Sequence, residues 1–533
     1  MGIRRRRSWR YLLAIVLASG LVAAACSSGG EGGQGGDGTG DAASGSEPDP
    51  AGIMRIGYPL LQSGLPAWHD PTTGTNGTSA NDVFYYLVYG RFFRPTVEGG
   101  IEPDLAESAT VVDANTIDLT VREGLTFSDG TPFDATAVRA GLERSLAANN
   151  VDAFLAPFFS LKAVQIVSPT TVRLSIPDGT APSWFDAFLS SWQTSIVKPG
   201  ETDFLEPVGA GPMTVESYDP ESAFVMRKNP TYWNVDNVKV AGMDFINIPF
   251  ASPESALTAL RADQVDITYA DPSQVTSLSG SLEPFAATNP NQVVWLHMCK
   301  KEGPLADARV RKAINKGIDR DAIDEAVYFG TAEPSTQMWP TGHRFNNPDV
   351  DDELAYDPDE AKALLQEAGY GNGVSIDIYP LPFAGISETT EVMKEQLADV
   401  GITLNIQQIT DYVGSYLVPS PPAIGVYPGN STGPAKLTAW TGTSIGNVCK
   451  YDDPELTQIF NDLGTVSASS DEAVDLWYEA DEKVTEEALG GFVVFRSQVA
   501  AFNADRIGDM TAWPKGGGYV TPDPLQTYVK SGS

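Results

Sequence analysis

One serine of this chain has neighbours that suit a nucleophile. The run Gly442–Gly446 fits the Gly-x-Ser-x-Gly turn of serine hydrolases, with Ser444 at its centre. In that chemistry a histidine, which follows the serine in the hydrolase order, takes up the hydroxyl proton. The chain has three histidines, His69, His297 and His343, and all of them precede Ser444. The sequence therefore argues against a serine hydrolase, and we predict that this protein is not an enzyme.

The sequence offers as little for a metal or a cofactor. Its three histidines are not spaced as a ligand pair, and its three cysteines, Cys26, Cys299 and Cys449, lie far apart. Neither a phosphate-binding Gly-Lys-Ser/Thr loop nor a His-Glu-x-x-His motif occurs. Paired acids such as Asp351-Asp352 lie near turns or helix starts, where capping and solvation account for them. We therefore predict no metal and no cofactor.

Cys26 follows a segment with the properties of an export signal. Four arginines, Arg4–Arg7, precede the apolar run Tyr11–Ala25, which is too short to span a bilayer with ease. The residues Leu21–Cys26 resemble a bacterial lipobox, in which the cysteine thiol receives a diacylglycerol and becomes the new N-terminus. Ala23 stands where a leucine is usual. An ordinary secretory signal with an incidental cysteine, and twin-arginine export, are the alternatives.

The segment after Cys26 has the composition of a flexible tether. Ser27–Pro50 is rich in Gly, Ser, Asp and Glu and has no aromatic or aliphatic cluster, so it cannot bury enough apolar surface to offset the entropy of ordering. As a flexible coil it would reach roughly 25–30 Å, enough to hold a folded body just off a membrane. We predict a lipoprotein signal peptide over residues 1–25 and a tether over 26–51.

Composition limits the partners of the folded body. The 533 residues are 42% hydrophobic, and 69 acidic against 35 basic side chains give a net charge of −34. Such a charge disfavours nucleic acid and anionic lipid as partners, so membrane contact would come from the acyl chain on Cys26. In an oxidising extracytoplasmic setting the two remaining cysteines, Cys299 and Cys449, are expected to form a disulfide.

Helix and strand patterns alternate along the body. Asp357–Glu360 supplies an N-cap and an early proline for a helix that ends at Gly369. A strand over Val374–Tyr379, a helix leading to Val400 and a strand over Ile402–Ile406 follow, and we expect the two strands to be parallel. Further strands are predicted over Ile117–Val121, Val172–Ile176, Phe245–Ile248, Val265–Tyr269, Val293–Met298 and Phe492–Phe495.

Short runs distributed along the chain resemble, in order, the motifs of one protein family. They are Asp70–Pro71, Val88–Phe93, Leu105–Ser108, Val121–Pro132, Pro207–Pro212, Arg227–Trp233, Asp263–Asp266, Arg309–Ile314, Ile318–Arg320 and Tyr356–Tyr370. Together they resemble the peptide/nickel class of ABC-transporter solute-binding proteins, the dipeptide- and oligopeptide-binding family. Taken alone, most of these runs read as turns and caps, so we expect them to be scaffold residues.

The resemblance implies an α/β fold of the two-lobed periplasmic-binding-protein type, class II, with an extra inserted domain. Lobe I would comprise 52–92, 205–298 and 490–533, the inserted domain 93–204, and lobe II 299–489. The resemblance also implies a ligand site on loops that face both lobes. The candidates are Trp68, His69, Trp192, Gln193, Tyr427, Trp440, Thr441 and Asn447.

One segment departs from the family. Peptide-binding members commonly carry an aspartate that pairs with the α-ammonium group of the peptide. The corresponding run Tyr427–Lys436 has no acid and ends in a lysine. The usual peptide anchor is therefore missing here.

By the resemblance, the protein is expected to capture a peptide or a similar polar solute and to deliver it to an ABC permease. It would act as a monomer, lipid-anchored on the outer face of the cytoplasmic membrane, on the periplasmic or extracellular side. Oligosaccharides, metal chelates and other polar metabolites are alternative solutes. A surface lipoprotein of the same fold that serves signalling or adhesion is an alternative function, and a lipid-anchored serine hydrolase is a third that the missing histidine disfavours.

Overall fold

The computed structural model describes residues 47–58, 60, 70–71, 79–96, 101–147, 161–189, 194–219, 221–248, 253–286, 292–299, 302–381, 385–408, 413–417, 419–429, 436–437, 439–441, 447–512 and 520–532. These residues belong to one compact unit, Ser46–Ser533. The predicted signal peptide and Cys26 lie outside the described residues. The end of the predicted tether is part of the fold, because the backbone N–H of Asp49 donates to the carbonyl oxygen of Val529 at 2.7 Å.

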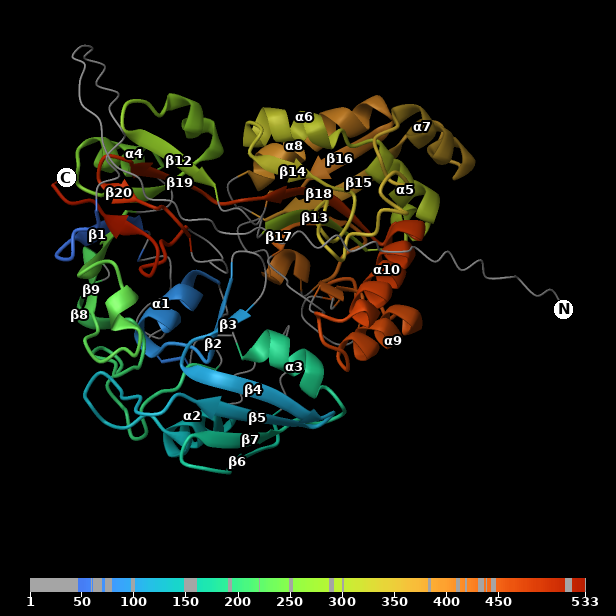
Figure 1. The fold of residues 1–533 in the computed structure, drawn as a ribbon. Helices are drawn as coiled ribbons and strands as arrows, with labels where there is room; N and C mark the ends of the chain where they lie inside the picture. Colours follow the sequence, from blue (N-terminus) through green and yellow to red (C-terminus); the bar gives the residue numbers. More distant parts are fainter. Residues whose placement is uncertain are drawn as a thin grey trace, which may run out of the picture. The chain divides into compact units, whose positions relative to one another are not determined.

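A mixed sheet forms the first lobe. Its strands, in spatial order and within the described part of the chain, are β12 (Leu282–Ala286), β19 (Val499–Asn503), β11 (Ile267–Ala270), β1 (Ile53–Tyr58), β10 (Gly242–Asn247), β9 (Ala223–Lys228) and β8 (Met213–Asp219). β1 runs parallel to both of its neighbours, and the other pairs are antiparallel. Helix α4 (Pro253–Arg261) packs against β11 and β19 (Figure 1).

A second mixed sheet forms the second lobe. Its described strands are, in spatial order, β14 (Ala332–Pro334), β18 (Gly490–Arg496), β13 (Gln292–Met298), β17 (Ile424–Gly429), β15 (Val374–Pro380) and β16 (Ile402–Ile406). β15 and β16 are parallel, with Ile378 opposite Ile406, as the sequence predicted. Helix α8 (Ile386–Asp399) connects them and packs on β15, β16 and β17.

A smaller antiparallel sheet falls within the predicted inserted domain, 93–204. Its order is β4 (Ala106–Asp113), β5 (Thr116–Val121), β7 (Thr171–Ser175) and β6 (Ala163–Ile166). Helix α2 (Ala135–Ala147) contacts β6 and β7, and α3 (Ala181–Phe188) contacts β4 and β5. Two strand pairs complete the described strands: β2 (Phe93–Pro95) with β3 (Ile101–Pro103), and β20 (Ile507–Gly508) with β21 (Tyr528–Val529).

Helix starts follow the capping residues. The Asp357 carboxylate accepts from the backbone N–H of Glu360 at 2.9 Å, as the sequence predicted, and Asp453 and Ser470 cap later helices in the same way. The remaining described helices are α1 (Ser79–Tyr89), α5 (Ala308–Lys316), α6 (Arg320–Ile323), α7 (Pro358–Glu367), α9 (Pro454–Leu463) and α10 (Asp471–Glu486), with the short helices η4 (Val235–Asn237), η5 (Pro272–Ser277), η6 (Pro304–Ala306), η7 (Asp324–Tyr328) and η8 (Val413–Leu417).

The chain passes between the two larger sheets twice. It leaves the first sheet after β12 and enters the second at β13, and it returns between β18 and β19. This moves two predicted boundaries, because the sequence analysis placed 205–298 and 490–533 wholly in lobe I. β13 and β18 belong to the second sheet, since β13 hydrogen-bonds to β17 on one side and to β18 on the other.

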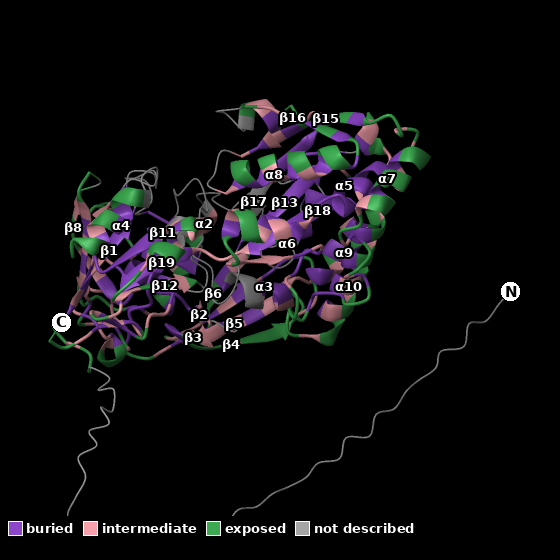
Figure 2. Cartoon of the chain, turned by 90° about the horizontal axis from the view of Figure 1, so that it is seen from above, coloured by how far each residue is buried: buried purple, intermediate pink, exposed green. Residues whose placement is uncertain are grey.

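Burial follows the sheets. In Figure 2 the central strands β13 and β18 of the second sheet are buried, whereas β15, β16 and α8 alternate between buried and exposed residues. Met393 and Leu397 lie on the buried side of α8, one helical turn apart. Over the described ranges, no helix combines the length and apolar character that crossing a membrane requires.

The motif residues within these elements hold the scaffold. A Cβ atom at Gly209 would lie 2.0 Å from the carbonyl oxygen of Val88 in α1. The close approach of these two segments therefore leaves room only for glycine at position 209. Arg320 is buried and forms no ion pair within the described chain. Its guanidinium donates instead to backbone carbonyl oxygens of Ser335, Phe492, Asn315, Ile318 and Leu354. These motifs therefore build the fold, as the sequence reading proposed.

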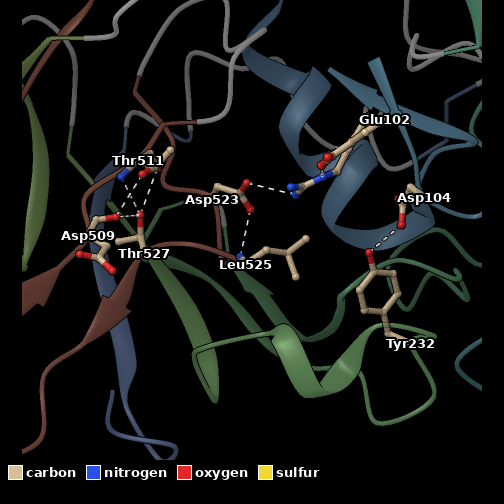
Figure 3. A network of polar contacts seen from close by, with 9 residues as sticks. Glu102, Asp104, Tyr232, Asp509, Thr511, Asp523, Leu525 and Thr527 are labelled. Atoms are coloured by element: carbon tan, nitrogen blue, oxygen red, sulfur yellow. Dashed lines mark hydrogen bonds and ion pairs between the residues drawn. The ribbon is translucent and has the colours of Figure 1, made fainter. Parts of the chain in front are cut away.

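A polar network connects β2 and β3 to the C-terminal segment. Arg94 pairs with Glu102 and with Asp523, the latter at 3.2 Å. Asp104 accepts hydrogen bonds at 2.7 Å from the Tyr232 hydroxyl and from Trp233 Nε1. Figure 3 shows Glu102, Asp523 and the hydrogen bond between Tyr232 and Asp104 beside the Asp509, Thr511 and Thr527 cluster. The network joins segments from both ends of the chain at the start of the inserted domain.

Candidate functional site

The candidate site lies at the loop that follows β17. β17 runs antiparallel to β13, with Tyr427 opposite Trp295. A disulfide joins Cys299, just after β13, to Cys449 at the far end of the loop, with the sulfur atoms 2.08 Å apart. This is the pairing that the sequence predicted. Both ends of the loop are thus fixed to the middle of the second sheet.

Trp440 anchors the loop in an aromatic cluster. Its ring lies 5.7 Å from that of Trp295 and 6.5 Å from that of Phe492, both in edge-to-face geometry. Its indole Nε1 donates to the carbonyl oxygen of Leu489 at 3.3 Å. The ring is buried, so Trp440 contributes apolar packing, and its indole N–H is used by the bond to Leu489 that holds the loop in place.

The other described candidates also use their polar groups within the loop. The Thr441 hydroxyl donates to the carbonyl oxygen of Leu437 at 3.1 Å. Asn447 Nδ2 donates to the carbonyl oxygen of Tyr451 at 2.5 Å, and its Oδ1 accepts from the backbone N–H of the same residue at 2.8 Å. Tyr427 lies in β17, and only its backbone is described. Ligand contact by these residues stays a prediction.

Several predicted residues lie outside the described part of the chain. These are Trp68, His69, Trp192, Gln193 and Ser444.

His297 lies next to Trp295 inside this cluster. The two rings are 4.7 Å apart in edge-to-face geometry. Burial lowers the pKa of His297 to about 3, because an imidazolium would lose its hydration there. His297 is therefore neutral at physiological pH and acts as a packing residue.

Lys436, the residue that marks the departure from the family, is buried beside the aromatic cluster. Its ammonium donates to the carbonyl oxygen of Met338 at 2.6 Å. It lies 4.3 Å from the ring centroid of Trp339 and 5.4 Å from that of Phe495, within the range of cation–π attraction. Burial lowers the pKa of Lys436, and the charge of Asp481 opposes that shift.

Asp481 is the acid that faces Lys436 from α10. Burial raises the pKa of Asp481, and the neighbouring charge of Asp351 raises it further. Backbone N–H groups of Met338 and Asn347 favour its charged form, but neither carboxylate oxygen accepts a hydrogen bond of normal geometry within the described chain. The pair is thus a buried cation and a buried acid that do not touch.

Sequence reasoning missed Trp295, Trp339, Phe495 and Asp481. A signal for Asp481 was present, because Trp477, Ala480 and Val484 mark the buried side of α10 and Asp481 lies among them. The three aromatic residues read as ordinary core positions. In the described ranges, no group of three or more His, Cys, Asp or Glu side chains is arranged to hold a metal ion.

Two mixed sheets that the chain crosses twice, together with an inserted antiparallel sheet, define a two-lobed α/β binding-protein fold. The model of the bacterial extracellular solute-binding proteins, family 5, matches residues 100–426. This chain belongs to that family, which confirms the resemblance found in its sequence.

Known proteins agree with this assignment. The glutathione-binding protein GsiB of Shigella flexneri is 27% identical over 346 residues, which is 61% of this chain and 66% of that relative. The chain thus matches just under two thirds of the relative's length. Among solved structures, the ABC-transporter substrate-binding protein CtaP of Listeria monocytogenes has a TM-score of 0.76 at 18% identity and covers 90% of this chain and 100% of its own. NikA of Brucella suis, in complex with Fe(III)-EDTA, has a TM-score of 0.75 at 19% identity over 88% and 100%.

Proposed function

We propose that this protein is an extracytoplasmic solute-binding lipoprotein that captures a peptide or a similar polar solute and delivers it unaltered to an ABC permease. Membership of family 5, which rests on residues 100–426, carries the proposal. The similarity to GsiB, a glutathione-binding protein, supports a small peptide-like solute. The similarity to NikA in complex with Fe(III)-EDTA keeps a metal chelate as the alternative class.

The topology suits a protein that closes over its solute. The chain connects the larger sheets twice, after β12 and after β18, so the lobes can rotate about a pair of connections. A solute closes such a hinge only if it binds the closed state more tightly than the open state. The solute must therefore contact both lobes.

The site chemistry suits polar solutes with some apolar surface. The described residues near the loop include the buried rings of Trp440, Trp295 and Trp339, with Lys436 as the charged group. Aromatic walls with a few polar groups are typical of small-molecule sites. An acid that could pair with a peptide's α-ammonium does not occur in the run Tyr427–Lys436.

The test is a thermal-shift panel on the exported protein. It should contain glutathione, mixed di- to pentapeptides, oligosaccharides and Fe(III)-EDTA. A solute at 100 times its Kd stabilises the folded state by about 2.7 kcal/mol, which corresponds to a rise of roughly 3 °C for a body of this size. We expect one class to raise the midpoint. A flat response to all classes, with unchanged solute uptake after gene deletion, would refute importer function and favour signalling or adhesion.

We also propose that Cys26 carries the lipid anchor. The basic start, the apolar run and the lipobox-like residues before Cys26 support it. Cells grown with a labelled fatty acid should label the wild-type protein, and Cys26→Ala should abolish the label and release the protein from the membrane fraction. Retention of label by Cys26→Ala would show that the anchor lies elsewhere.

A further inference from the structure

Lys436 is buried without a counter-ion in contact. Its ammonium has three N–H donors, and the one hydrogen bond that it makes in the described chain goes to the carbonyl oxygen of Met338. No carboxylate of the described residues lies within 4.0 Å of it. Its other two donors therefore have no acceptor among the described residues, although buried ammonium groups are normally paired.

Two neighbours are also unsatisfied. Within the described part of the chain, neither carboxylate oxygen of Asp481 accepts a hydrogen bond of normal geometry, and Trp339 Nε1 has no acceptor. Lys436 and Asp481 approach the same residue through its two neighbouring peptide groups, since Lys436 binds the Met338 carbonyl and the Met338 N–H faces Asp481. Buried polar atoms only rarely lack a hydrogen-bond partner, so several such atoms side by side point to a ligand that supplies the partners.

Lys436 and Trp339 lie closer to solvent than Asp481 does. Lys436 and Trp339 are each 7% exposed, whereas Asp481 is 1% exposed and Met338 is fully buried. A group that enters from this side therefore reaches the side chains of Lys436 and Trp339 before the acid. Because donors need an acceptor and the outer charge is positive, the group that fits is an anion with two acceptor oxygens.

The ring of Trp339 forms the wall between this place and solvent. Lys436 lies 4.3 Å from its centroid, and the exposed ring of His343 stacks on it at 4.4 Å with an interplanar angle of 8°. Phe495 contributes a second aromatic surface 5.4 Å from the ammonium. Aromatic rings on two sides exclude water and strengthen a charge-assisted hydrogen bond.

We propose that Lys436 and the indole N–H of Trp339 anchor a carboxylate group of the bound solute. This inference rests on the proposed function and deepens it: the solute is an acid or a peptide held by its carboxylate, with its positive end, if any, elsewhere. Asp481 is a positioning residue, which lies behind Lys436 at the backbone N–H of Met338.

The experiment uses the exported protein with propionate and propionamide as probes, at ionic strength matched with chloride. Propionate should raise the melting midpoint in a saturable way, and propionamide, which has the same shape and no charge, should not. Lys436→Met should weaken the propionate response at least tenfold. Trp339→Phe, which keeps an aromatic ring but removes the N–H donor together with the pyrrole ring, should weaken it severalfold.

Controls separate binding from folding. Lys394→Met changes an exposed lysine of the same lobe, whose partner is Glu391, and should keep the full response. If Lys436→Met does not fold, the double variant Lys436→Met/Asp481→Asn removes both buried charges and should fold without responding to propionate.

Two results would overturn the inference. One is a wild-type protein that responds equally to propionate and propionamide, or to neither, which would make Lys436 and Asp481 a structural pair. The other is an unchanged propionate response in the Lys436 variants. If a solute from the thermal-shift panel binds wild type and Lys436→Met equally well, this inference is wrong but the proposed function is supported. If no solute of the panel raises the midpoint, the result counts against the proposed function itself.

Discussion

Breaking the Cys299–Cys449 disulfide should destabilise the fold and loosen the candidate binding loop. The cross-link spans 150 residues of sequence. For a closed loop of that length the chain-entropy relation gives about 5 kcal/mol at 25 °C, and measured disulfides commonly contribute about 2–4 kcal/mol. A body of this size has an unfolding entropy of about 1 kcal/mol/K, so the midpoint should fall by roughly 2–5 °C.

The assay compares wild type with Cys299→Ala/Cys449→Ala by differential scanning calorimetry, each with and without reductant. Reductant should lower the midpoint of wild type and leave the double variant unchanged, because only wild type has a bond to break. The double variant should also bind the solute more weakly, since the bond fixes the loop end near Asn447 to the end of β13.

Two outcomes would refute this reasoning. Mass spectrometry of the non-reduced protein that finds both thiols free would show that the bond does not form. Equal midpoints of oxidised wild type and the double variant would show that packing around Trp440 alone fixes the loop.

Three further predictions concern the scaffold. Burial lowers the pKa of His297 from 6.5 to about 3, so on acidification the unfolded chain binds a proton at this residue before the folded protein does. The free energy of unfolding should therefore fall by about 2 kcal/mol from about pH 7 to about pH 5. In urea titrations at several pH values, His297→Gln should lose less stability over this range, and an equal loss in both proteins would contradict the assignment. Gly209→Ala forces a Cβ atom onto the Val88 carbonyl oxygen and should cost about 3 kcal/mol or more, while Gly371→Ala, with 3.6 Å of space, should cost little. Arg320→Met leaves buried carbonyl oxygens without their donor. Each unsatisfied buried group costs about 1–3 kcal/mol, so the variant should lose about 3 kcal/mol or more. A change below about 1 kcal/mol would show that water replaces the guanidinium.

Local structure could be predicted from the sequence because its causes are local. The cap at Asp357, the positive φ of Gly369 and the parallel pair β15 and β16 follow from short-range patterns. The family and the fold class are confirmed, since many weak motifs in one order are specific together. The Cys299–Cys449 pair was predictable because the predicted signal leaves only two cysteines to bridge.

Pairing over long distances could not be predicted in the same way. A strand such as β13 carries an apolar sequence that fits either sheet, and its hydrogen-bond partners decide which one it joins. The burial of Lys436 was equally hidden, because a lysine in a loop is normally solvated. Its depth depends on Trp339 and Phe495, which lie about 100 residues before it and about 60 after it.

The order of strands in the first sheet has a consequence for synthesis. β19 separates β12 from β11, and it comes from the last part of the chain. The sheet that β1 begins is therefore incomplete until about residue 503 has left the ribosome. A protein built in this way cannot finish folding domain by domain during translation. The first sheet therefore stays one strand short until the final segment emerges, with β11 and β12 unpaired along the sides that β19 later covers.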